Sequence, residues 1–134
     1  MDGAPALNGL TQRIIGAAIE VHRHLGPGLL ESIYQECLAR ELASRRLAFT
    51  LQQSVPVVYK GVCLSAVYRL DVVVERIVVV ELKSVEALSA VHVAQTLTYM
   101  RLAACPAGLL INFNVPRLRD GIKRLVDGLP RTAL

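Results

Sequence analysis

Three charged residues in the middle of the chain have the types and the spacing that a metal site requires. Asp71 and Glu81 lie ten residues apart, and Lys83 follows two residues later. If a three-residue loop joins two antiparallel strands here, Val74 pairs with Val78. Asp71 then lies opposite Glu81, on the same face as Lys83. A two-residue loop would instead place the two carboxylates on opposite faces.

Two opposed carboxylates repel each other, and a buried pair is costly without a compensating charge. A divalent cation between them removes that cost, and a few oxygen ligands with retained waters suit Mg²⁺ or Mn²⁺. A neighbouring lysine can orient or deprotonate a water, or neutralise charge that develops on a phosphate. The alternative is a surface face with solvated charges and a weak ion pair. The three valines before Glu81 favour the metal site, because such a run is typical of a strand buried on both faces.

Two helices are predicted before these strands. A helix over Leu10–Leu25 has apolar side chains at spacings of four, three and four, and Gly26, Pro27 and Gly28 end it. A second helix is predicted over Leu29–Arg46, with an apolar inward face made of Leu30, Ile33, Tyr34, Cys37, Leu38 and Leu42. Together they form a helical hairpin at the N-terminus.

The rest of the chain alternates between strand and helix patterns. Three antiparallel strands are predicted over Thr50–Tyr59, Val62–Val74 and Ile77–Lys83. Pro56 places the first at a sheet edge or a bulge, and Lys60 with Gly61 forms a turn. A helix over Ser84–Leu102 and a buried strand over Leu109–Phe113 follow, and the tail beyond Asp120 fits either a strand or a helix.

The composition limits the class of protein. A chain of 134 residues predicts one α/β domain over residues 1–134, and 53% hydrophobic with 19% charged residues excludes an intrinsically disordered chain. No apolar run reaches the roughly 20 residues of a membrane-spanning helix, and the N-terminus lacks the pattern of a secretory signal. Three widely spaced cysteines provide neither a disulfide framework nor a paired zinc motif, so we expect a cytoplasmic protein.

The charge balance bears on the partner. A net charge of +4 is compatible with a polyanion, although many basic domains bind none. Aromatic residues make up only 4%, which argues against a base-stacking platform. Arg117, Arg119, Lys123 and Arg124 form a basic cluster near the C-terminus, which either follows a phosphate backbone or is an ordinary solvated face.

The pattern of Asp71, Glu81 and Lys83 resembles that of the PD-(D/E)XK nuclease superfamily. More closely, the chain is similar to the small GxxExxY proteins placed within it, through five ordered blocks that span nearly its whole length: GPGLLESIY (26–34), YRLDVVVE (68–75), VVVELKSVE (78–86), HVAQTLTYM (92–100) and GLLINFN (108–114). The resemblance implies an α/β restriction-endonuclease-like core, a mixed β-sheet flanked by helices. Leu70 stands where the superfamily's name has proline, at a position that varies among its members.

The resemblance also implies roles for individual residues. Asp71 and Glu81 match the metal ligands, the backbone carbonyl of Leu82 would be a third ligand, and Lys83 matches the catalytic lysine. Glu31 matches an acidic residue on an early helix that completes many such sites. Without the resemblance, Glu31 fits equally well a glutamate favoured by the dipole at a helix N-terminus.

His92, Gln95 and Tyr99 lie on one face of the third helix. Gln95 and Tyr99 resemble a Q-x-x-x-Y motif of exonuclease-like members, whose glutamine lies beside the metal, so we expect Gln95 to be catalytic and His92 and Tyr99 to bind substrate. Alternatively, Tyr99 is packed core and His92 is a satisfied or exposed histidine. Arg69 would lie opposite Lys83 and contact a phosphate, or else pair with a carboxylate.

These observations favour a Mg²⁺-dependent or Mn²⁺-dependent nuclease that hydrolyses phosphodiester bonds, with DNA favoured over RNA. One alternative is a catalytically silent module that keeps the nuclease fold for binding or regulation. Another is an interaction protein in which Asp71, Glu81 and Lys83 form a simple ion-pair network. A short chain leaves little surface for base readout, and the exposed strand around Pro56 is consistent with a homodimer.

Overall fold

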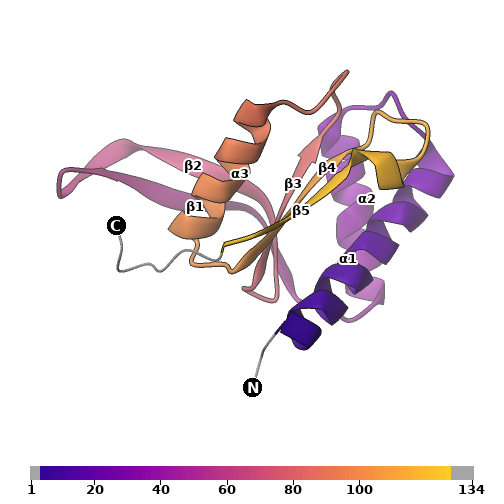
Figure 1. The fold of residues 1–134 in the computed structure, drawn as a ribbon, viewed down its shortest axis with the longest axis horizontal. Helices are drawn as coiled ribbons and strands as arrows, with labels where there is room; N and C mark the ends of the chain where they lie inside the picture. The colour runs from indigo at the N-terminus through magenta and orange to yellow at the C-terminus, as the bar shows by residue number, and fades with distance from the viewer. Residues whose placement is uncertain (1–3, 128–134) are drawn as a thin grey trace.

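The computed structural model describes residues 4–127 and shows a five-stranded sheet with helices on both faces (Figure 1). Helices α1 (Ala4–Leu25) and α2 (Glu31–Ser44) pack against each other, which confirms the helical hairpin. Helix α1 begins before Leu10 because Leu7 also packs against the core. The prediction that Leu30 and Ile33 point inward was wrong, since their exposed fractions are 71% and 41%.

The sheet is mixed. Its strands are β1 (Phe49–Tyr59), β2 (Val62–Val74), β3 (Val78–Lys83), β4 (Ala107–Asn112) and β5 (Ile122–Val126), in that order across the sheet. Strands β3 and β4 are parallel, and the other neighbours are antiparallel. The tail, which the sequence left open, forms a short 3₁₀ helix, η1 (Leu118–Gly121), and then β5 as an edge strand.

Strands β1 and β2 form a long hairpin whose outer part extends away from the rest of the sheet (Figure 1). We call residues 54–68 the arm. Both Lys60 and Gly61 have positive φ, as a two-residue hairpin turn requires. The register shifts between Pro56 and Val58 on an edge strand, so Pro56 marks both a sheet edge and a bulge.

Helix α3 (Ala90–Leu102) is shorter than predicted from the helical spacing over Ser84–Leu102. The backbone of Ser84 and Val85 is bound to side chains from other elements, and Ser89 is the real N-cap. The Ser89 hydroxyl accepts from the backbone N–H of His92, whose ring Nδ1 accepts from the backbone N–H of Ser89. This reciprocal pair satisfies two groups that the helix end leaves open.

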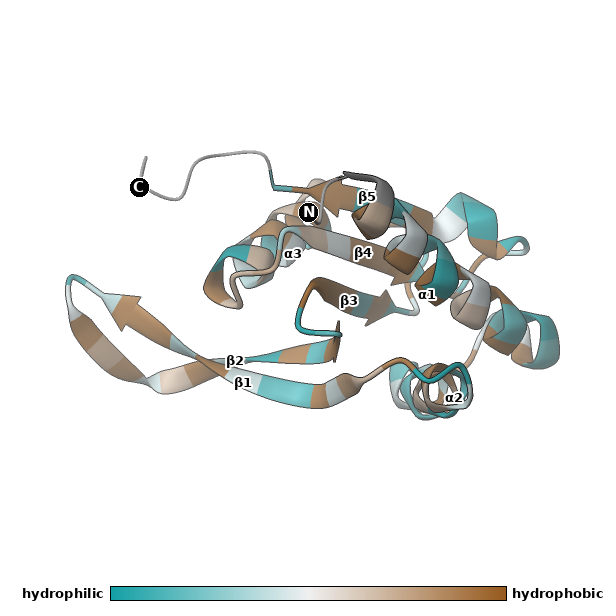
Figure 2. Ribbon diagram, turned by 90° about the horizontal axis from the view of Figure 1, so that it is seen from below, coloured by the Kyte–Doolittle hydropathy of each residue, from teal (hydrophilic) through white to brown (hydrophobic). Residues whose placement is uncertain are grey.

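The sheet separates two apolar cores. Helices α1 and α2 cover one face, where Ile14 and Leu38 share a core with Val80 and Ile111 of the sheet. Helix α3 covers the other face through Tyr99 and Met100. Strand β4 is buried along its whole length and β3 nearly so, and Figure 2 shows both as largely hydrophobic ribbons inside the molecule. No described helix is long and apolar enough to cross a membrane.

Candidate metal centre

The loop between β2 and β3 sets the register of the central carboxylates. Val74 pairs with Val78, and the backbone N–H of Ile77 donates to the carbonyl oxygen of Val74 at 2.9 Å. Glu75 and Arg76 have positive φ, which closes the chain in three residues. The three-residue loop on which the sequence argument depended is confirmed.

Beyond Val72 and Val80, the carboxylates of Asp71 and Glu81 replace backbone-to-backbone pairing between β2 and β3. The carboxylate of Glu81 accepts from the backbone N–H of Asp71 at 2.9 Å. In return, Oδ2 of Asp71 accepts from the backbone N–H of Leu82 at 2.9 Å. The register therefore brings the two carboxyl groups together, as expected, and holds each with a backbone donor.

The burial of this pair makes its charge unfavourable. Glu81 is only 3% exposed, and burial, followed by the negative charge of Asp71, raises the pKa of Glu81 to about 8. Burial also raises the pKa of Asp71, although the hydrogen bond from Leu82 acts in the opposite direction. Two hard oxygen donors that resist ionisation side by side fit a divalent cation, which would let both ionise.

A cleft of about 360 Å³ opens beside this pair. It is lined by Glu31, Ser32 and Gln35 from α2, Gln52 from β1, Asp71 from β2 and Leu82 from β3. Three of the four predicted metal ligands therefore line one cleft. The fourth, Glu81, is joined to Asp71 by the hydrogen bond described above.

Glu31 lies at this cleft but is engaged by the backbone. Its carboxylate accepts from the backbone N–H of Ser84 at 3.0 Å, and the Ser84 hydroxyl donates to the carbonyl oxygen of Leu29 at 2.6 Å. Its negative charge still contributes to the raised pKa of both central carboxyl groups. Among residues 4–127, no three His, Cys, Asp or Glu side chains already enclose a metal position, so direct ligation by Glu31 stays a prediction.

Lys83 is close to the carboxylates without being paired to them. Its positive charge lowers the pKa of both Asp71 and Glu81. Within the described part of the chain it forms no ion pair with either. A simple ion-pair network of these three residues is therefore not present, and the ammonium group remains available for another partner.

Tyr34 has a role that the sequence analysis missed when it treated this residue only as core. Its hydroxyl donates to the carbonyl oxygen of Gly26 at 2.6 Å and accepts from the backbone N–H of Leu29 at 3.1 Å. Its ring stacks on Phe113 with centroids 4.3 Å apart. Tyr34 thus fixes the loop before α2 and, through it, the position of Glu31. A fully buried tyrosine needs hydroxyl partners, and that was the available signal.

Gln52 was also missed. Its backbone has φ +50°, a costly conformation for a residue other than glycine. Its side-chain amide donates to Oδ1 of Asp71 at 3.3 Å and to the side-chain oxygen of Gln35 at 2.7 Å. Gln52 therefore holds the Asp71 oxygen that Leu82 does not. Its place in a strand gave no sequence signal of this conformation.

Gln95 and Tyr99 do not line the carboxylate cleft. They line a second cleft of about 230 Å³, together with Tyr68, Val91, Ala94 and Thr98. Burial, followed by the negative charge of Glu81, raises the pKa of Tyr99. A catalytic role for Gln95 and substrate contact by Tyr99 stay predictions.

His92 and Arg69, which were predicted to bind substrate, have other structural roles or positions in the fold. The His92 ring caps α3, which is the satisfied-histidine alternative. The prediction that Arg69 lies opposite Lys83 was wrong, because β2 pairs with β3 only as far as Val72. Arg69 instead pairs with Ser54 on β1 and is exposed. Substrate binding by either side chain stays a prediction.

The comparisons with known proteins agree with this geometry. The family model of the PD-(D/E)XK nuclease superfamily matches residues 8–125, from α1 into β5. Neither the curated proteins nor the solved structures that were searched contain a match. The mixed sheet, the N-terminal helical pair and the family match together show an α/β restriction-endonuclease-like fold. The chain belongs to the PD-(D/E)XK nuclease superfamily.

Proposed function

We propose that this protein is a nuclease that uses Mg²⁺ or Mn²⁺ to hydrolyse phosphodiester bonds, with DNA favoured over RNA. One observation carries the proposal: Glu81 is buried and Asp71 is half-buried beside it, and neither forms an ion pair with a described cation. Membership of the superfamily supports nuclease activity, and nucleases of this superfamily generally use divalent metals.

In this proposal Asp71, Glu81 and the carbonyl of Leu82 hold the ion, and Glu31 completes the set. When bound, the ion neutralises the two carboxylates and activates the phosphodiester toward attack by water. Lys83 orients that water or stabilises negative charge on the phosphate, because its ammonium group has no described ion-pair partner. Gln52 keeps Asp71 oriented through its amide.

We also place the chain in the GxxExxY group. Gly28, Glu31 and Tyr34 match the three letters, and each has a structural task at the metal centre. Gly28 has φ +95°, which closes the turn before α2, and Tyr34 fixes the same loop. Glu31 then meets the backbone at the end of β3. The motif thus describes one unit that joins α2 to the metal-binding strands.

Three further proposals follow from the sequence. Residues 1–134 form one domain, and the protein acts in the cytoplasm, as the odd number and wide spacing of its cysteines suggest.

Two copies associate through the arm, where Val58 and Val62 are each 60% exposed. Association would extend the surface that contacts nucleic acid beyond what one short chain offers.

The first test is calorimetric titration of Mn²⁺ into the wild type and into Asp71→Asn, followed by cleavage assays on DNA and RNA. We expect saturable binding that weakens at least about tenfold in the variant, with cleavage reduced about 100-fold or more. Glu36→Gln is the matched control, because it removes one carboxylate from α2 that is 75% exposed and outside the cleft.

Equal Mn²⁺ binding by wild type and Asp71→Asn would contradict the metal centre. Metal binding without cleavage of any DNA or RNA would contradict nuclease activity and favour the silent binding module. Loss of Mn²⁺ binding in Glu36→Gln as well would show that general surface charge, not this pair, attracts the ion.

A further inference from the structure

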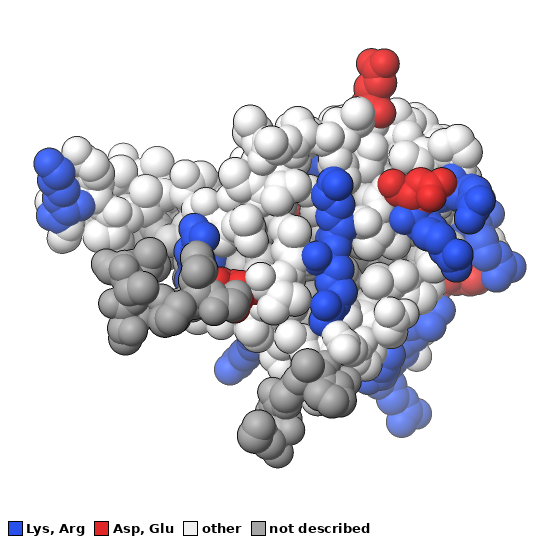
Figure 3. Space-filling model, viewed as in Figure 1, with Lys and Arg blue, Asp and Glu red and all other residues white. Residues whose placement is uncertain are grey.

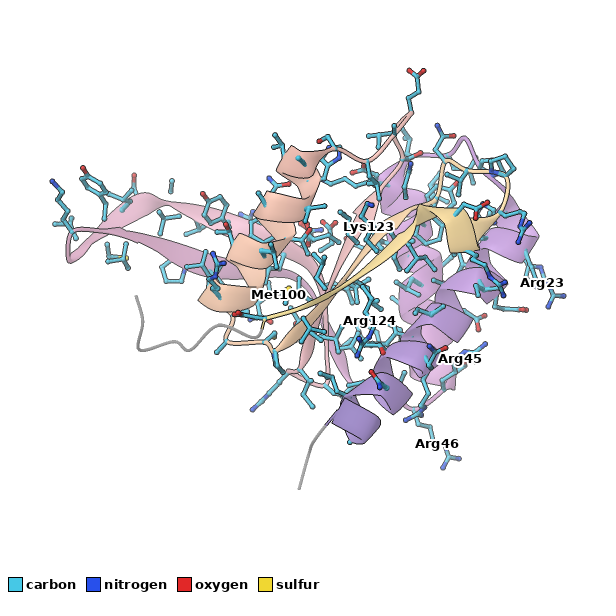
Figure 4. The ribbon with its side chains drawn as sticks, viewed as in Figure 1. Arg23, Arg45, Arg46, Met100, Lys123 and Arg124 are labelled. Atoms are coloured by element: carbon cyan, nitrogen blue, oxygen red, sulfur yellow. The ribbon has the colours of Figure 1, made fainter. Side chains whose placement is uncertain are left out.

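A third cleft lies where the end of α1 meets η1, and it shares no lining residue with the cleft at the metal centre. Its volume is about 350 Å³. It is lined by Ile19, His22 and Arg23 near the end of α1, and by Pro116, Arg117, Leu118 and Arg119 at the start of η1. We call it the arginine cleft. Figure 3 shows basic side chains gathered at this side of the molecule, and Figure 4 places Arg23 at its outer edge.

The arginine cleft has an excess of positive charge. Arg117 and Arg119 are exposed, and neither forms an ion pair with another described residue. Arg23 is partly neutralised by Glu20 at 3.2 Å, but that carboxylate also binds His24 at 2.9 Å. Even if Asp120 is counted with Glu20, there are two carboxylates for three arginines, and two of these arginines form no ion pair with a described residue.

The floor and walls of the arginine cleft are held in place by the fold. His22 is 8% exposed, and its Nε2 is hydrogen-bonded to the carbonyl oxygen of Val115 at 2.9 Å. This bond ties α1 to the segment that bears Arg117. At the other end of η1, Gly121 packs so closely on the Asn112 carbonyl that no side chain fits there. The cleft is therefore formed before any ligand arrives.

The lining suits one kind of ligand. Guanidinium groups bind phosphate oxygens through paired, charge-assisted hydrogen bonds. The apolar side chains of Ile19 and Leu118 also line the cleft and offer a surface for the carbon face of a sugar. Phosphate next to sugar is the repeating unit of a nucleic-acid strand.

We propose that the arginine cleft binds a phosphate of the nucleic acid and so holds the strand at a distance from the metal centre. The proposal rests on the proposed function, because it assumes a nucleic-acid substrate. The basic cluster predicted from the sequence is thereby divided. Arg117 and Arg119 bind the strand, whereas Arg124 is used within the protein, where it donates to Asn8 and Thr11.

The test compares Arg117→Gln/Arg119→Gln with Arg40→Gln/Arg46→Gln, which removes the same charge from exposed arginines outside every cleft described. Both pairs are made in the Asp71→Asn background, so that the DNA stays intact, and in the wild-type background for cleavage. Binding of a labelled oligonucleotide of about 20 nucleotides is measured by fluorescence anisotropy over a range of salt concentrations. We expect the cleft pair to weaken binding at least about tenfold and to lower the salt slope by about two, with much smaller changes in the control pair.

Oligonucleotides with and without a 5′-phosphate distinguish the source of the ligand. A loss of affinity for both identifies an internal phosphodiester, and a loss confined to the phosphorylated strand identifies a terminal phosphate. Equal effects of the two arginine pairs would overturn the arginine cleft, while metal-dependent cleavage by the wild type would leave the proposed function intact. A wild type that neither binds nor cleaves any oligonucleotide would overturn both. Thermal melts check that each variant is folded.

Discussion

The carboxyl group of Glu81 is the clearest link between sequence and chemistry at the scale of single residues. Three buried valines precede it, and a carboxylate opposes it across the hairpin. Its pKa of about 8 lies far above the ordinary value of 4.5. The folded, metal-free protein therefore keeps a proton on this pair at a pH where the unfolded chain has released it.

This difference predicts how stability changes with pH. Between about pH 5 and pH 8 the folded state binds more protons than the unfolded state, so the free energy of unfolding falls as the pH rises. We expect the melting temperature in EDTA to drop by several degrees across this window. Saturating Mg²⁺ should remove most of the drop, because the ion stabilises the ionised pair.

Glu81→Gln is the control for this experiment. A neutral amide of similar size has no proton to lose, so the melting temperature of this variant should change much less with pH and respond little to Mg²⁺. The same pH slope in the variant and the wild type would show that other groups cause it.

At the scale of residues, the sequence predicted which side chains share a face of the hairpin, because an even spacing and the length of the turn determine this. The even spacing of Asp71 and Glu81 and the loop of three residues determine which side chains meet. The sequence shows the spacing directly, whereas the loop length was a condition that the structure then confirmed. Arg69 is also an even number of residues from Lys83, yet the prediction that the two lie opposite each other was wrong. Backbone pairing between β2 and β3 ends where the backbone N–H groups of Asp71 and Leu82 donate to carboxylates instead. No pattern in the sequence predicts this end.

At the scale of elements, strand β1 supports the metal centre through an unusual backbone. On either side of Gln52, the strand pairs regularly with β2, Leu51 with Val72 and Gln53 with Leu70. Gln52 itself departs, with φ +50°, and its amide donates to Asp71 and Gln35. The strain of this conformation, on the order of 1–3 kcal/mol, is offset by the regular strand around it.

The substitution Gln52→Gly removes both the side-chain hydrogen bonds and the backbone strain, and measurements of stability and of metal affinity distinguish the two effects. Glycine adopts this φ freely, so we expect the free energy of unfolding to change by no more than about 1 kcal/mol as relief of strain balances the lost hydrogen bonds. The affinity for Mn²⁺ should fall about tenfold, because Asp71 loses its second support. Denaturant unfolding and calorimetry measure the two quantities.

Gln53→Gly is the matched control on the same strand. Gln53 has an ordinary strand backbone and lies outside the cleft, so this change should cost about 1 kcal/mol and leave Mn²⁺ affinity unchanged. If the two glycine variants had the same Mn²⁺ affinity, Gln52 would be no more than a structural residue.

At some boundaries, contacts with residues distant in the sequence, not the local sequence pattern, determine where an element begins. Helical spacing continues through Ser84, but Glu31 and Asn112 bind the backbone there and delay α3 until Ser89. The bonding partners lie 53 and 27 residues away, so a local pattern contains no trace of them. The strands and the helical hairpin were predictable because apolar periodicity alone decides them.

At the scale of the whole molecule, the features proposed to meet nucleic acid lie apart. The metal centre lies where α2 meets the strands, and the arginine cleft lies where α1 meets η1. The arm extends away from both (Figure 1), and much of its ribbon is hydrophobic in Figure 2. Its exposed apolar residues include Val58, Val62 and Val67. A two-stranded hairpin is marginally stable in water by itself, so a partner that covers these side chains would stabilise it.

The proposed homodimer through the arm predicts a change in mass without a change in fold. Val58 and Val62 pair with Cys63 and Tyr59 across the hairpin, so they lie on opposite faces of the arm and replacing both alters each face. We expect Val58→Lys/Val62→Lys to raise the dimer dissociation constant at least tenfold in analytical ultracentrifugation, because two desolvated charges would oppose association.

The free energy of unfolding of the variant monomer should stay within about 0.5 kcal/mol of the wild-type value, since each valine is 60% exposed. Val91→Lys controls for added charge, because Val91 is 71% exposed but lies on α3. An equal shift caused by Val91→Lys would remove the arm from the interface. A wild type that sediments as a monomer at every concentration would overturn the homodimer and leave the metal centre to act in a single chain.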